Sequence, residues 1–160
     1  AAELQREQDT TRRVLERVPE DKLTWRPHLK SMSLGQLALH VATIPANLSQ
    51  LAALDAFDAA NANFEAAQPA SKGEILAAMD AAVASAAEYL RLLTATSAGA
   101  PWRLTLHGSE VFAMPRAVML RNLLFNHWYH HRGQLSVYLR LLDVPVPVIY
   151  GRSADENPFA

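Results

Sequence analysis

Helical periodicity runs through almost the whole chain, and it is strongest in the segment from about residue 115 to residue 142. There, apolar side chains recur every three to four positions, as on one face of an amphipathic helix: Leu120, Leu124, Leu135, Tyr138 and Leu142. His127 and His131 stand one turn apart on this same face. Because an unpaired buried polar group costs about 1–3 kcal/mol, histidines aimed at a core must be hydrogen-bonded or ligated.

Three further segments carry the helical pattern and have recognisable boundaries. The first covers about residues 2–18 and stops before a proline. The second begins at Ser33, whose spacing to Gln36 fits a capping box, and contains Pro45, which should kink it. The third begins at about Ser71 and runs into the nineties. Four long helices around one core predict an all-α protein, a four-helix bundle.

Two segments interrupt the helical pattern. Residues 99–113 contain glycine, proline and a short apolar stretch, which predicts an extended loop or a short hairpin before the last helix. Residues 144–151 alternate valine with proline and cannot be helical, but they are too apolar for a free tail. We expect this tail to pack back on the helices, so that residues 1–160 form a single domain.

A third histidine belongs with the pair on the last helix. His40 shares a helical face with Ile44 and Leu51, so it also points inward. Three inward histidines from two helices match a three-ligand catalytic metal site with an open fourth position. We therefore expect His40, His127 and His131 to hold one divalent metal ion. Imidazole suits Zn, Ni, Cu or Fe, and we favour Zn or Ni.

The remaining histidines and one arginine are weaker candidates. His130 lies nearer the edge of the apolar face, His107 falls in the irregular segment where it could reach the mouth of the site, and His28 is expected at the surface. Arg132 points away from the paired histidines and is expected in solvent or at a dimer contact. The alternative interpretation of the three inward histidines is that they are hydrogen-bonded core residues without a metal ion.

Composition excludes several classes of protein. The formal net charge is −1 without a block of like charges, which argues against a nucleic-acid surface. No apolar stretch reaches the roughly 20 residues of a membrane helix, so no membrane partner is expected. The chain has no cysteine, which rules out disulfides, thiolate zinc sites and a cysteine nucleophile within it. A cytoplasmic location is the default expectation.

The run Asn-His-Trp-Tyr-His-His-Arg-Gly-Gln at 126–134 resembles the last-helix signature of DinB-like and YfiT-like metalloenzymes. The stretches 33–42 and 146–151 support the same resemblance, which covers essentially the whole chain. It implies an up-down-down-up four-helix bundle, often a homodimer, with one divalent metal ion on three histidines. Those ligands fall on His40, His127 and His131. Family members with assigned activity include thiol-dependent S-transferases and a mycothiol-dependent isomerase.

The leading functional prediction is a metal-dependent enzyme that acts on a small-molecule substrate. A metal-bound water or thiolate would be the nucleophile, giving a hydrolase or a thiol-dependent S-transferase that uses a low-molecular-weight thiol. No carboxylate adjoins the histidine motif, so the general base of His-Glu-x-x-His enzymes is missing. The alternative is a non-catalytic metal- or ligand-binding stress-response protein. The sequence shows no catalytic side chain that would decide between the enzyme and this binding protein.

Overall fold

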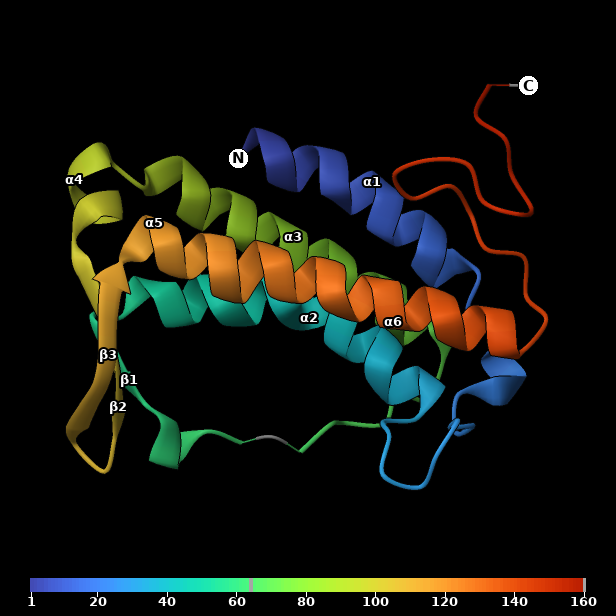
Figure 1. Ribbon diagram of the computed structural model, residues 1–160, viewed down its shortest axis with the longest axis horizontal. Coiled ribbons are helices and arrows are strands. Elements are labelled where there is room, and N and C mark those ends of the chain that lie inside the picture. The colour runs from blue at the N-terminus through green and yellow to red at the C-terminus, as the bar shows by residue number, and fades with distance from the viewer. Residues whose placement is uncertain (64, 160) are drawn as a thin grey trace.

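Long helices lie side by side along the longest axis of the protein, and a small sheet extends from one end of them (Figure 1). The computed structural model describes residues 1–63 and 65–159. The helical elements are α1 (Ala2–Glu16), the 3-10 turns η1 (Glu20–Lys22) and η2 (Ala59–Asn61), α2 (Leu34–Ala53), α3 (Lys72–Leu92), α4 (Ala95–Gly99), α5 (Arg116–Met119), the π-helical η3 (Leu120–Asn126) and α6 (His127–Leu141). The strands are β1 (Ala56–Asp58), β2 (Pro101–Leu106) and β3 (Ser109–Pro115).

The four long helical segments begin close to where the sequence predicts, and the predicted cap of the second one is present. The Ser33 hydroxyl accepts a hydrogen bond from the Gln36 backbone N–H at 3.1 Å, and the Gln36 side chain accepts from the Ser33 N–H at 2.9 Å. This is the capping box expected at the start of α2. Ser71 caps α3 in a similar way, through the backbone N–H of Glu74. Pro115 directly precedes the long helical segment formed by α5, η3 and α6.

The sheet is mixed, with the strand order β1-β2-β3. β2 and β3 form an antiparallel hairpin, and β1 pairs with β2 in parallel register, with Phe57 opposite Leu104. Asp58 at the end of β1 accepts hydrogen bonds from the backbone N–H groups of His107 and Gly108 in the hairpin turn. This carboxylate therefore fixes the tip of the hairpin against the end of β1.

The all-α fold class predicted from the sequence, an up-down-down-up four-helix bundle, is wrong. The hairpin expected within residues 99–113 is present as β2 and β3, but β1 joins it and makes the protein a mixed α/β structure. β1 has only three residues, too few to show the alternation that identifies a strand in a sequence. Its pairing depends on a hairpin far along the chain, which local patterns do not report.

The core fills the space between the helices. Trp102 and Trp128 are fully buried in it, together with leucine, valine and isoleucine side chains from α1, α2, α3 and α6. The tail packs back on this core as predicted, since Pro147 is buried and Val146 and Ile149 contact the core cluster. Within the described part of the chain, no helix combines the length and the hydropathy needed to cross a lipid bilayer.

Candidate metal centre

Three histidine side chains from two helices converge between α2 and α6. One ligand nitrogen from each of His40, His127 and His131 lies within 4.8 Å of the others. The Nε2 atoms of His40 and His127 are 3.1 Å apart. Two nitrogens bound at 2.0–2.1 Å to one tetrahedral zinc ion would be about 3.3 Å apart, so His40 and His127 already have nearly the spacing that a shared metal ion requires.

Helix phase explains why these histidines meet. His127 is the first residue of α6 and His131 follows one turn later, so both imidazoles leave the same face of the helix. His40 reaches them from the N-terminal half of α2, which packs against α6. The preceding segment, Leu120–Asn126, is π-helical, and such wide turns are frequent at functional sites. The sequence analysis missed the π-helix, because apolar periodicity does not distinguish it from an ordinary helical turn.

The three imidazoles are held in the neutral form that ligates metals. Burial, with a smaller contribution from neighbouring imidazoles, lowers the pKa of His40 and the pKa of His127 to about 4 each. Burial also lowers the pKa of His131. At neutral pH each ring therefore offers a nitrogen lone pair, which is the state required of a metal ligand.

Gln134 orients one of the three rings. Its side-chain oxygen accepts a hydrogen bond at 2.7 Å from Nδ1–H of His131, one turn earlier on α6. This bond places the proton on Nδ1, so that Nε2 of His131 is free to bind a ligand. The sequence analysis gave Gln134 no role, although its spacing of three residues from a candidate ligand is the available signal.

The other histidines lie outside this group. His28 and His107 are exposed, and His107 occupies the hairpin turn with a positive φ of 51°. His130 is exposed as well, with its ring centroid 4.9 Å from that of His131, but it is not among the converging side chains. The sequence ranking of His130 and His107 below the inward three agrees with these positions.

Arg132 is buried, which corrects the expectation that it lies in solvent or at a dimer contact. Only 1% of its side chain is exposed, and it forms an ion pair with Glu7 of α1 at 2.8 Å. It donates a hydrogen bond to the Thr11 hydroxyl, and its guanidinium lies over the rings of Tyr129 and Tyr150. The residue next to His131 therefore ties α6 to α1 and to the C-terminal tail.

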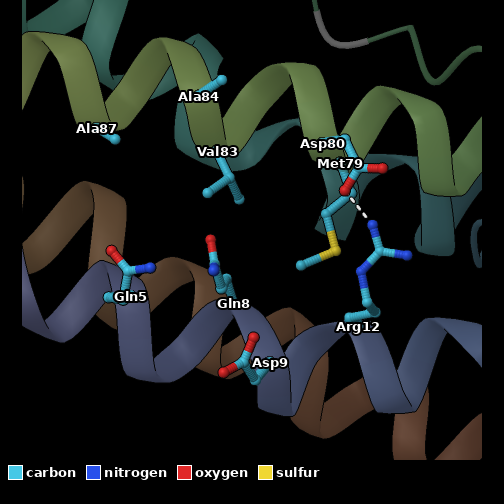
Figure 2. Close-up of a pocket in the computed structure, with 9 residues that line it drawn as sticks. All are labelled: Gln5, Gln8, Asp9, Arg12, Met79, Asp80, Val83, Ala84 and Ala87. Atoms are coloured by element: carbon cyan, nitrogen blue, oxygen red, sulfur yellow. Dashed lines mark hydrogen bonds and ion pairs between the residues drawn. The ribbon is translucent and has the colours of Figure 1, made fainter.

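A separate groove of about 340 Å³ opens between α1 and α3 (Figure 2). No histidine lines it, and an ion pair between Arg12 and Asp80 crosses one end. Its size alone does not make it the functional site, because its polar side chains do not converge on a common point. The convergent donors at His40, His127 and His131 are the stronger candidate.

Comparison with known proteins gives one family. The DinB family model matches residues 1–157. A DinB-like protein from Bacillus cereus is similar in structure, with 22% identity, a TM-score of 0.63, and coverage of 90% of this chain and 91% of that one. The DinB-like protein YjoA from Bacillus subtilis has 19% identity and a TM-score of 0.67, with coverage of 91% and 94%. No curated protein matches the sequence.

Proposed function

The chain belongs to the DinB family, and from this premise we propose that it is a metal-dependent enzyme whose divalent cation is held by three histidines. The observation that carries the proposal is the convergence of His40, His127 and His131, with a ligand nitrogen of each within 4.8 Å of the others. Burial keeps these rings neutral, and Gln134 already orients His131. These are features that a metal site needs and a hydrophobic core does not.

The donor set indicates which ion and which chemistry fit. Three imidazole nitrogens without a thiolate or carboxylate suit zinc or nickel better than magnesium or calcium, which prefer oxygen ligands. A bound divalent ion supplies Lewis acidity that lowers the pKa of a coordinated water or thiol. Because the group contains no carboxylate to act as general base, we favour thiol-dependent S-transfer to a small electrophile, with hydrolysis as the second reaction.

Turnover by the metal-loaded protein tests this proposal. Wild type reconstituted with Zn²⁺ or Ni²⁺ would be assayed on chromogenic esters alone and on aryl halides with low-molecular-weight thiols. We expect product formation that His127→Ala abolishes and that His130→Ala retains, since His130 is a neighbouring exposed histidine outside the group. A thiol requirement would identify the transferase, and ester cleavage without thiol would identify the hydrolase.

The alternative reading has its own outcome in the same assay. Stoichiometric metal binding without turnover on either panel would contradict the enzyme and favour a non-catalytic metal- or ligand-binding protein. The homodimer and the small-molecule substrate stay predictions. Light scattering at micromolar concentration tests the dimer directly, because a single species with the mass of one chain would contradict it.

A further inference from the structure

A proline inside α2 leaves one buried carbonyl without its usual partner. Pro45 has no backbone N–H, so the Val41 carbonyl one turn earlier cannot accept the hydrogen bond that an α-helix normally supplies. Val41 is fully buried, where water is not available to replace the missing donor. The position of Pro45 therefore creates a single acceptor that some other part of the protein must satisfy.

Trp128 of α6 satisfies it. The indole Nε1–H donates to the Val41 carbonyl oxygen at 2.9 Å, and the indole is fully buried. Each partner directly follows one of the converging histidines: Val41 follows His40, and Trp128 follows His127. The bond thus joins α2 to α6 beside the two imidazoles whose Nε2 atoms are 3.1 Å apart.

We infer that the hydrogen bond from the Trp128 indole to the Val41 carbonyl, which Pro45 leaves without a helical donor, positions the histidines of α2 and α6 for metal binding. The inference rests on the proposed function. Metal–nitrogen distances tolerate only about 0.2 Å of error, so the two helices must be fixed in their sliding and separation before the three imidazoles can share one ion. A directional bond one residue away from His40 and His127 restrains both displacements, whereas apolar packing alone is non-directional.

Trp102 is a matched control within the same chain. It is also fully buried, and its indole N–H also donates to a carbonyl of α2, that of Leu51, at 3.2 Å. Leu51 lies ten residues beyond Val41, which is about 15 Å along the helix. Replacement of either tryptophan by phenylalanine removes an indole donor and the same volume, but only Trp128 adjoins the histidines.

Cobalt binding is the test, because Co²⁺ reports both affinity and coordination through its visible absorption. Metal-free wild type, Trp128→Phe and Trp102→Phe would be titrated with Co²⁺ after circular dichroism has shown that each variant is folded. We expect Trp128→Phe to bind about tenfold more weakly, in the range typical of residues that orient ligands, with a changed visible spectrum. Trp102→Phe is expected to stay within about twofold of wild type and to keep its spectrum.

Pro45→Ala separates positioning from the stability cost of an unpaired carbonyl. In this background the N–H of the introduced alanine can donate to the Val41 carbonyl, so loss of the Trp128 bond no longer leaves that oxygen without a partner. We therefore expect Trp128→Phe to shift the melting temperature less in the Pro45→Ala background than in wild type. The roughly tenfold loss of Co²⁺ affinity should persist, because α6 is still released from α2.

The outcomes distinguish this inference from the proposed function. If wild type binds Co²⁺ and Trp128→Phe binds equally well, the positioning role is wrong while the metal site stands. Equal weakening by Trp102→Phe would also overturn the inference, because a general loosening of the core would then explain both results. If wild type itself binds no metal, the proposed function fails and the positioning role fails with it.

Discussion

Removal of the Arg132 guanidinium should destabilise the protein far more than removal of any surface charge. Arg132 and Glu7 form an ion pair at 2.8 Å in which the two side chains are 1% and 13% exposed. The Tyr150 hydroxyl also donates to Glu7, at 2.9 Å. Arg132→Met keeps most of the side-chain volume but leaves the Glu7 carboxylate without its cation. Breaking a buried pair from one side typically costs about 3–5 kcal/mol.

The magnitude translates into a measurable shift in melting temperature. For a protein of this size, 1 kcal/mol corresponds to roughly 2–4 °C, so Arg132→Met should lower the melting temperature by about 6–20 °C. Urea unfolding of metal-free protein, monitored by circular dichroism, would give the free energy of unfolding. Arg140→Met is the matched control, because Arg140 pairs with Asp155 at the surface with 48% of its side chain exposed. It should cost less than about 1 kcal/mol.

A double substitution tests the stated reason for the loss. Glu7→Gln combined with Arg132→Met removes both charges and leaves a side chain that can still bond the Tyr150 hydroxyl. The double variant should therefore be more stable than the sum of the two single losses predicts, with a coupling of about 1–3 kcal/mol. If Arg132→Met costs no more than Arg140→Met, the buried ion pair does not stabilise the junction of α6, α1 and the tail.

Three further substitutions have clear expectations. A hydrogen bond from Arg121 lowers the pKa of Glu3 to about 2, so this carboxylate stabilises the folded state above pH 4.5 and its contribution is lost as the pH falls towards 2. Glu3→Gln should therefore flatten that part of an acid-unfolding curve. Gly133→Ala should stabilise α6 by up to about 1 kcal/mol in thermal unfolding, since an added Cβ meets nothing within 4 Å. A lower melting temperature for this variant would contradict the prediction. Gly35→Ala should cost about 1–3 kcal/mol of unfolding free energy in urea, because its Cβ would lie 2.7 Å from the Gln68 amide and 3.0 Å from the Leu23 carbonyl. An unchanged free energy of unfolding would show that these neighbours move aside without cost.

Local signals in the sequence were sufficient for the four long helical segments and for the grouping of the histidines. Ser33 and Ser71 are recognisable caps because the hydroxyl needs only the N–H groups of the next turn. The convergence of His40, His127 and His131 follows from helical phase, since all three lie on inward faces.

Features that depend on distant partners could not be predicted in this way. Arg132 looked like a surface residue by helical phase, yet Glu7 and Thr11 of α1 provide the partners that allow its burial. The strand Ala56–Asp58 exists because β2 lies beside it, not because its own residues alternate. The hydrogen bond between Gln134 and His131 could be identified only once the position of the His131 ring was known. In each case the deciding contact joins side chains or segments whose proximity the local pattern does not encode.

Metal content, measured by plasma mass spectrometry, shows whether His40, His127 and His131 form a metal site. Tag-free wild type, His127→Ala and His130→Ala would be compared after reconstitution with Zn²⁺, Ni²⁺ or Mn²⁺ and removal of unbound ion. We expect about one ion per chain in wild type and His130→Ala, and none in His127→Ala. Bound ion should also raise the free energy of unfolding, by about 2.7 kcal/mol at a hundredfold excess over Kd. Absence of metal from wild type after every reconstitution would mean that the three histidines are hydrogen-bonded core residues and not ligands.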